Sequence, residues 1–286
     1  MSFSEKRIDV TFNLAVGQFE GGGNTATVSG LRVVTQITNH GGAEQSMAVV
    51  AIYGMPLSLM NQLTNVGTRY TGAFQNGILI EAGDADGMTL VFAGTIFNAF
   101  VSAQGMPEVF LQVVAQVGYF FKIKPVPALS VRGSSDVATM MAGIAKQLGL
   151  TFENAGVTAK LADAYYWGTA WQQASAIAKD AGIDWIIDKT TLAIMNPSTP
   201  RKGEIPLIAA ETGMVGYPAF NTNQVIVTAL FNPAVKYMGQ VEIKSELAGA
   251  SGKFIVQDLV YDLESQVPHG RWFMTITAYT AGAIPA

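Results

Sequence analysis

Apolar and polar side chains alternate along the N-terminal part of the chain with the two-residue period of half-buried β-strands. This pattern predicts strands over residues 8–14, 28–37, 48–52, 77–82, 88–100 and 107–116. Glycines such as Gly21-Gly22-Gly23 and Gly30, and the segment Asp84-Ala85-Asp86-Gly87, predict turns between strands. Residues 55–63 carry leucine and methionine at helical spacing behind Pro56, which predicts one short helix. The region is therefore expected to form an antiparallel barrel or sandwich.

The hydrophobic period changes in the middle of the chain. Ser134-Ser135-Asp136 precedes an apolar-periodic run over 137–148 that stops at Gly149, which predicts a capped helix. A second run over 169–181 stops at Gly182. Segments 183–188 and 191–195 alternate and are joined by two residues, as in a β-hairpin. Prolines bracket this small α+β region at both ends.

The C-terminal part returns to short strands, predicted over 203–208, 223–230, 239–247, 252–263 and 271–279. The predicted fold class is mainly β, α+β overall, with two β domains that flank a small α+β domain. The expected boundaries are 1–125, 126–200 and 201–286.

The composition indicates that the chain is not an ordinary soluble monomer, because charged residues are scarce. They make up 13% of the 286 residues, against about 25% in an ordinary soluble domain. Hydrophobic residues make up 49%, and the mean hydropathy is +0.29. The uncharged stretches 45–68, 87–107 and 212–235 contain Asn, Gln, Pro or Ser, which disfavours membrane spans, and no signal peptide is visible. We therefore expect large faces covered by other subunits and no membrane insertion.

The chain offers little for catalysis or cofactor binding. It has no cysteine and two histidines, His40 and His269, which both read as solvated turn residues. A serine nucleophile elbow is missing. A carboxylate pair for glycoside hydrolysis stays open, with Asp180, Asp184 and Asp188 as candidates by proximity only. Asp180 reads more simply as a helix end, and Asp184 and Asp188 as one solvated strand face. The prediction is a non-enzyme with no catalytic, cofactor-binding or metal residue and no cofactor.

Other motifs favour structural interpretations. Asp84–Gly87 lacks the further ligands of a Ca²⁺ loop. Gly249–Lys253 lacks the first glycine and the hydroxyl of a phosphate loop. The aromatic cluster of Tyr165–Trp167 with Trp171 and Trp185 could be a carbohydrate platform or a subunit hot spot. The favoured interpretation places at least two of these three tryptophans in the core of the α+β region. The methionine- and alanine-rich run over 139–145 reads as a packed helix face.

Three stretches resemble the baseplate hub proteins of long-tailed bacteriophages, which join the tail tube to the spike. One runs from Tyr166-Trp167-Gly168 to the hairpin that ends at Pro197. Another runs from Glu211-Thr212-Gly213 through Ala229-Leu230-Phe231-Asn232-Pro233. The third covers 252–263 and 271–276, where Tyr261 stands in a region in which family members often have histidine.

The resemblance implies a homotrimer in which each chain supplies two tail-tube-like β-barrels. Three chains then give a pseudo-sixfold ring that matches the tail tube, with true threefold symmetry toward the spike. The implied partners are the tail tube protein, the central spike protein and other baseplate or tape-measure proteins, with DNA only as passing cargo. The implied location is the virion tail baseplate, after synthesis in the host cytoplasm. The alternatives are a distal tail or tail tube protein, or a tail-associated cell-wall hydrolase.

Overall fold

The computed structural model describes residues 4–40, 45–64, 76–247 and 249–280. Strands predominate in it, which confirms the mainly β fold class. The chain divides into two compact units. Unit 1 comprises Met1–Asn39, Ser46–Val117 and Val260–Met274, and unit 2 comprises His40–Gln45, Gly118–Leu259 and Thr275–Ala286. The division into three domains at 125/126 and 200/201 stays a prediction.

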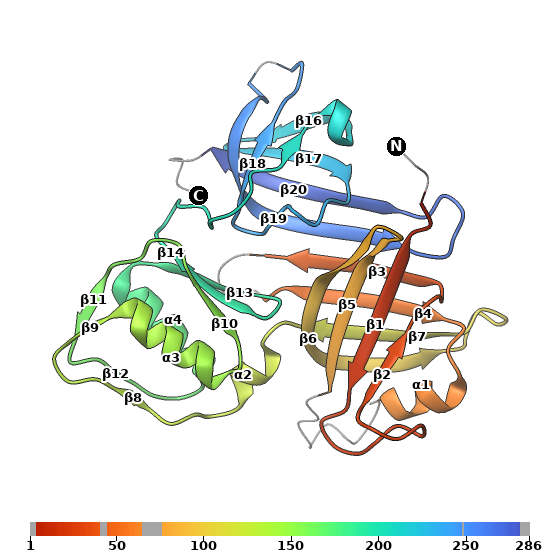
Figure 1. Cartoon of the computed structure of the whole chain (residues 1–286), viewed down its shortest axis with the longest axis horizontal. Coiled ribbons are helices and arrows are strands. Elements are labelled where there is room, and N and C mark those ends of the chain that lie inside the picture. Colours follow the sequence, from red (N-terminus) through yellow and green to blue (C-terminus); the bar gives the residue numbers. More distant parts are fainter. Residues whose placement is uncertain (1–3, 41–44, 65–75, 248, 281–286) are drawn as a thin grey trace. The chain divides into compact units, whose positions relative to one another are not determined.

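Unit 1 is built on an antiparallel sheet with the strand order β3-β4-β7-β6-β5-β1-β2 (Figure 1). The helix α1 lies between β4 and β5 in the chain and packs against β6. Its elements are β1 (Arg7–Asn13), β2 (Thr25–Val28), β3 (Val33–Asn39), β4 (Met47–Tyr53), α1 (Leu57–Leu63), β5 (Gly77–Asp84), β6 (Gly87–Ser102) and β7 (Phe110–Gln116).

The predicted alternation places the core of unit 1. On β1, Ile8, Val10 and Phe12 are fully buried, and Val10 lies opposite Ile80 of β5. Burial of every second side chain fixes the register, because a slip by one residue would expose the whole apolar set. One strand expectation is wrong: 28–37 holds the end of β2, a turn at Gly30 with φ +67°, and most of β3. The left-handed backbone at Gly30 divides the run into two strands.

The strand β6 is long and irregular, and glycine is required at one of its positions. Its pairing with β7 shifts between Ile96 and Asn98. A Cβ atom at Gly94 would lie 2.8 Å from the carbonyl oxygen of Gln116, too close for any side chain. The missing side chain therefore lets β6 approach the end of β7. At the other end of β6, Ala85 and Asp86 form the predicted turn from β5.

The small α+β region of unit 2 places α3 and α4 beside a three-stranded sheet (Figure 1). In this sheet β14 pairs in parallel with β10 and antiparallel with β13, which confirms the predicted 183–195 hairpin. The elements are α2 (Tyr119–Ile123), β8 (Leu129–Ser130), β9 (Ser134–Asp136), α3 (Val137–Gln147), β10 (Thr151–Asn154), β11 (Lys160–Ala162), β12 (Tyr165–Tyr166), α4 (Ala170–Ala181), β13 (Asp184–Asp188) and β14 (Thr191–Met195).

The two main helices differ in how they begin. Thr169 caps α4: its hydroxyl accepts from the backbone N–H of Gln172 at 3.2 Å, and the Gln172 side chain accepts from the N–H of Thr169 at 2.9 Å. Gly182 ends α4 in the left-handed conformation, as predicted. At α3 the predicted side-chain cap is missing, since Asp136 belongs to β9 and its carboxylate lies 3.6 Å from Lys160. Met140, Met141 and Ala145 are buried, so the packed-face interpretation of α3 is confirmed.

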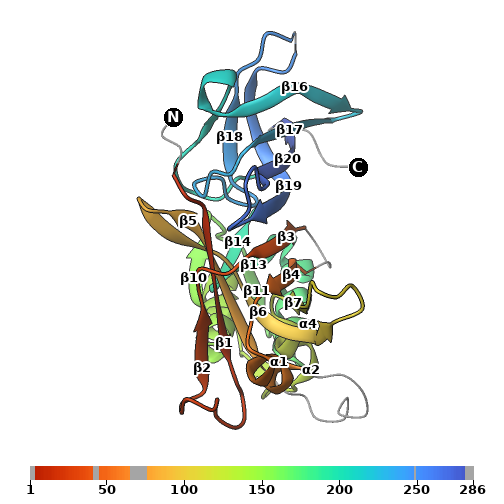
Figure 2. The ribbon, with the colours of Figure 1, turned by 90° about the vertical axis from the view of Figure 1, so that its right-hand side faces the viewer.

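In the C-terminal part of the chain the strand order is β16-β17-β20-β19, and β18 pairs with β19 and β15 (Figure 2). Strands β19 and β20 each contribute residues to both units. The sequence did not predict β16, and β15 is shorter than expected. Within the described residues no closed barrel is detected. The elements are β15 (Leu207–Ile208), η2 (Ala210–Thr212), β16 (Met214–Asn221), β17 (Gln224–Leu230), β18 (Gln240–Ile243), β19 (Gly252–Glu264) and β20 (Trp272–Thr280).

None of the helices in the described ranges is long and apolar enough to cross a membrane.

Candidate functional site

The two histidines lie in different environments. His269 is exposed in the turn between β19 and β20 with φ +59°, which confirms the prediction. His40 departs from it, because its ring is half-buried and Nδ1 lies 3.1 Å from a carboxylate oxygen of Asp258. Both residues belong to unit 2, His40 in the segment that follows β3 and Asp258 on β19. A histidine and a carboxylate alone do not make a hydrolytic triad, which also needs an oriented nucleophile.

The three candidate carboxylates engage different surroundings. Asp180 accepts a hydrogen bond from the Tyr166 hydroxyl at 2.8 Å, and burial together with this carboxylate raises the pKa of Tyr166 to about 12. Burial raises the pKa of Asp184 on β13. Asp188 is not on a solvated face: its side chain is 14% exposed and forms an ion pair. Each carboxylate thus has a structural setting of its own.

The partner of Asp188 is Arg201, the centre of the most buried charged group in unit 2. Arg201 Nη1 donates to Asp188 at 2.6 Å, and Nη2 donates to Glu153 at 2.7 Å. The Arg201 side chain is 4% exposed. Burial disfavours its charge, but the hydrogen bonds that Arg201 donates to Glu153 and the charge of Asp188 outweigh burial and raise the pKa of Arg201. We call Arg201, Glu153 and Asp188 the Arg201 clasp.

The Arg201 clasp ties the small sheet to the segments that lead into β15 and β18. Glu153 lies on β10 and Asp188 on β13, while Arg201 Nη1 also donates to the carbonyl oxygen of Tyr237 at 3.3 Å. Tyr237 and Met238 pack with residues of the small sheet in one apolar cluster. Sequence reasoning missed this group, because Glu153 is separated from Arg201 by 48 residues and no local spacing marks the pair.

The turn motifs are occupied by hydrogen bonds within the fold and by strand pairing. Asp84 accepts from the backbone N–H of Asp86 at 3.0 Å, from Lys6 Nζ at 2.8 Å and from Ser4 Oγ at 2.6 Å. The hydrogen bonds from Lys6 and Ser4 hold the pKa of Asp84 well below its usual range. Gly252 and Lys253 begin strand β19. Across the described ranges, no three His, Asp or Glu side chains are grouped so that they could hold a metal ion.

The aromatic cluster is divided between core and surface. Trp171 and Trp185 contact each other with ring centroids 4.6 Å apart and ring planes tilted by 59°. Lys122 Nζ lies 4.6 Å from the Trp171 ring centroid. These two tryptophans are half-buried, in line with the favoured interpretation. Trp167 is instead 72% exposed and Tyr165 is 63% exposed. Tyr165 on β12 and Trp167 just after this strand therefore both present exposed aromatic side chains.

The strand β16 offers an apolar surface at the end of its sheet. Val215, Tyr217 and Phe220 are all more than 40% exposed. The pairing with β17 is irregular between Val215 and Ala219, and Pro218 lies in this bulge. A proline and a bulge protect an edge strand from indiscriminate pairing. Such an apolar strand in a chain with few charges is typical of a surface covered by another protein chain.

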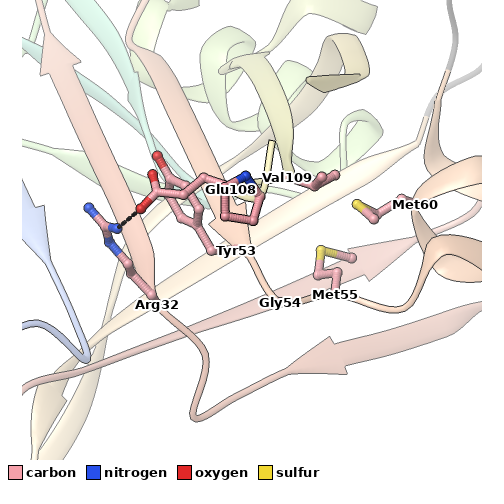
Figure 3. A pocket seen from close by; sticks show the side chains of 8 residues that line it. Arg32, Tyr53, Gly54, Met55, Met60, Glu108 and Val109 are labelled. Atoms are coloured by element: carbon pink, nitrogen blue, oxygen red, sulfur yellow. Dashed lines mark ion pairs between the residues drawn. The ribbon is translucent and has the colours of Figure 1, made fainter. Parts of the chain in front are cut away.

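Unit 1 carries an open pocket of about 400 Å³ (Figure 3). Met55 and Met60 are almost fully buried and lie at one side of it. Arg32 lies at the other side, with its guanidinium carbon 4.5 Å from the centroid of the Tyr53 ring. Arg32 is 3.8 Å from Glu108 and 3.3 Å from Glu264. The pocket is lined by Arg32, Tyr53, Gly54, Met55, Met60, Pro107, Glu108 and Val109.

Sequence reasoning missed this pocket. Its residues come from the start of β3, the segment between β4 and α1, and the loop before β7. No short motif links these segments, so only the folded sheet brings Arg32 and Glu108 together. The two opposite charges beside two methionines make the pocket a surface for a ligand with both an apolar and a charged part.

Two solved structures with the same fold are described as tail proteins. The tail protein of Neisseria meningitidis MC58 is 11% identical with a TM-score of 0.62, and each chain covers 97% of the other. The 43 kDa tail protein of prophage MuSo2 from Shewanella oneidensis is 9% identical with a TM-score of 0.61, with 96% of this chain and 97% of that chain covered.

A third structure with this fold comes from a secretion system. The c3393 protein of Escherichia coli is a component of the type VI secretion system with structural similarity to the T4 bacteriophage tail proteins gp27 and gp5. It is 8% identical with a TM-score of 0.61, and 96% of this chain and 79% of that chain are covered. At this level of identity the likeness establishes the fold.

The family follows from the sequence itself. A search of curated proteins returns no significant match. The family model described as baseplate hub gp41 matches residues 7–278, nearly the whole chain. The match confirms the resemblance drawn from the strand and turn motifs of the sequence, and the chain belongs to the baseplate hub gp41 family of phage tail proteins.

Proposed function

We propose that this protein is the structural hub of a bacteriophage tail baseplate, a homotrimer that joins the tail tube to the central spike. The family match over residues 7–278 carries the proposal. The hub would lie in the virion and contact the tail tube protein, the spike protein and other baseplate or tape-measure proteins. Its role is structural, and its chemistry is that of protein–protein contact.

The low content of charged side chains supports an assembled state. Only 13% of the residues are charged, although a soluble monomer must cover its surface with solvated groups. The exposed side chains of β16, with Trp167 and Tyr165, give apolar surface that subunits or partners can cover. Burial of these faces removes apolar area from water and stabilises the assembly.

The proposed trimer has a definite arrangement. The β regions of 1–125 and 201–286 would act as two tube-like domains on either side of the 126–200 domain. Strands β2 and β16 stand at the two ends of the strand order of the described 13-stranded sheet, and a ring of copies would cover these edges. Three copies with two such domains each would match a sixfold tube. A mildly acidic channel wall would let DNA pass during ejection, since like charges repel.

Two experiments separate the hub from its alternatives. Native mass spectrometry of the purified protein should give three copies per particle, whereas a tail tube protein should give six. A zymogram on peptidoglycan should show no cleared band. A hexamer would overturn the hub in favour of a tube or distal tail protein, and a cleared band that survives purification would favour the cell-wall hydrolase.

A further inference from the structure

The pocket of unit 1 has the chemistry of a socket for an apolar side chain accompanied by a cation. Met55 and Met60, 6% and 4% exposed, supply an adaptable apolar wall. Arg32 lies between Glu108 and Glu264, and Arg271 pairs with both Glu264 and Asp262, so this group of two arginines and three carboxylates keeps one negative charge. The Glu108 side chain is 68% exposed and 3.8 Å from Arg32, a loose ion pair that leaves its carboxylate open to another cation.

One surface of the same chain has the complementary chemistry. Among the large hydrophobic residues exposed in the described ranges, Ile123 is the one with a lysine on each side. It is 44% exposed at the end of α2, beside Lys122 and Lys124. Lys122 lies over the Trp171 ring, which holds this turn of α2 in place. Lys124 is exposed next to Ile123, so an apolar group and a cation are presented together.

The distribution of charge along the chain also favours attraction between the pocket and the α2 surface. Unit 1 contains five Lys and Arg residues and nine Asp and Glu residues, so its formal net charge is −4. The whole chain has the same net charge of −4, so the remaining residues are neutral in sum. The stretch 109–135, which includes α2, contains three basic residues and no acidic residue. The surface around Glu108 and the surface around Lys124 therefore attract each other when they belong to two copies.

We propose that the α2 knob, which consists of Ile123 and Lys124, docks into the unit 1 pocket of a second copy of this chain. Ile123 packs against Met55, Met60 and Val109, and the ammonium group of Lys124 pairs with the Glu108 carboxylate. The contact runs head to tail, with knob and pocket on different copies, and a threefold rotation between copies closes it into a ring. The inference rests on the proposed homotrimer and names the surfaces that hold it together.

A reciprocal charge exchange tests the contact. Glu108→Lys and Lys124→Glu should each raise the protein concentration at which half the chains are assembled by about tenfold, because an attractive pair becomes repulsive. The double variant should return toward the wild-type value. Sedimentation velocity at low ionic strength measures the oligomer, and added salt should shrink the difference between variants.

Matched controls separate the contact from general charge effects. Glu20→Lys and Lys202→Glu make the same charge changes at exposed positions of units 1 and 2 and should leave assembly unchanged. Ile123→Ala removes the apolar knob at an exposed position, so folding should persist while assembly weakens severalfold. A rescue by the double variant supports the contact. Two results overturn the docking contact and leave the proposed hub intact. One is that the control variants weaken assembly as much as the test variants, and the other is that the protein is a stable trimer in which the double variant is not rescued.

The absence of cysteine allows an independent measurement. A Glu108→Cys variant mixed with a Lys124→Cys variant should form a disulfide-linked pair under mild oxidation, because only contact between copies joins the two. Glu20→Cys mixed with Lys202→Cys should stay unlinked. A trimer without the first cross-link overturns the docking contact alone, and a protein that is monomeric in solution and in the virion overturns the trimer as well.

Discussion

Removal of Arg201 tests how far one buried cation holds unit 2 together. Arg201→Met keeps an unbranched apolar stem but deletes the guanidinium group and its five hydrogen bonds to Glu153, Asp188 and the Tyr237 carbonyl. Two carboxylates that are 25% and 14% exposed would then face each other without a cation. The perturbation therefore acts through uncompensated charge and leaves the apolar packing almost unchanged.

The expected loss is large for a single substitution. Breaking a buried ion pair on one side costs about 3–5 kcal/mol. Partial exposure of Glu153 lets water screen part of this cost, so we expect about 3 kcal/mol for Arg201→Met. If unpaired charge is the cause, neutralising both carboxylates should recover at least half of the loss. The triple variant Arg201→Met with Glu153→Gln and Asp188→Asn makes that comparison.

Urea denaturation followed by tryptophan fluorescence is a suitable assay. Trp167, Trp171 and Trp185 belong to unit 2, so the fluorescence signal reports mainly on that unit. Lys202→Met deletes an exposed neighbouring cation and is the matched control, with an expected change below about 0.5 kcal/mol. The reasoning is refuted by a loss under about 1 kcal/mol for Arg201→Met, or by a triple variant that is no more stable than the single one.

Three further predictions concern other parts of the fold. The folded-state pKa of Asp84 lies below its ordinary value of 3.8, so its interactions stabilise unit 1 fully above that pH and weaken as the pH falls below it. In denaturation at pH 6 and pH 3, the stability difference between wild type and Asp84→Asn should therefore be larger at pH 6. Thr169→Ala removes the cap of α4 and should cost about 1 kcal/mol in urea unfolding. Phe12→Ala opens a cavity in unit 1 at a fully buried position and should cost about 3–5 kcal/mol.

Each of these predictions has a clear contrary result. A constant difference between wild type and Asp84→Asn from pH 6 to pH 3 would contradict the account of the lowered pKa. Thr169→Ser keeps the hydroxyl and should lie close to wild type, so equal losses for both substitutions would contradict the role of the cap. A Phe12→Ala variant within 1 kcal/mol of wild type would contradict the packing of β1 on β5.

The sequence was informative wherever local patterns determine structure. The alternation over 8–14 predicted the bounds of β1 to within one residue and identified its buried face. The capping residue Thr169 and the helix-ending Gly182 predicted both ends of α4. The two residues between 188 and 191 placed the hairpin of β13 and β14. These features depend on hydrophobic period, capping and turn chemistry, which act over a few residues.

Features that depend on distant partners could not be predicted. Asp136 stands where a cap is expected, but β9 pairs with β11 and brings its carboxylate to Lys160. Trp167 is one helical turn from Trp171 in the sequence, yet it precedes α4 and points to solvent. The pocket around Arg32 and the Arg201 clasp exist only once separate strands meet. Which residues form the pocket and the clasp is therefore determined by the tertiary fold and not by a local sequence pattern.

The central claim is that this chain closes a threefold ring between a sixfold tube and the spike. A cryo-EM reconstruction of the virion tail tip, refined without imposed symmetry, measures it most directly. We predict three copies of the chain in one ring, six β-rich lobes toward the tube and threefold density toward the spike. Six copies in the ring, or a single copy outside the channel axis, would contradict the account.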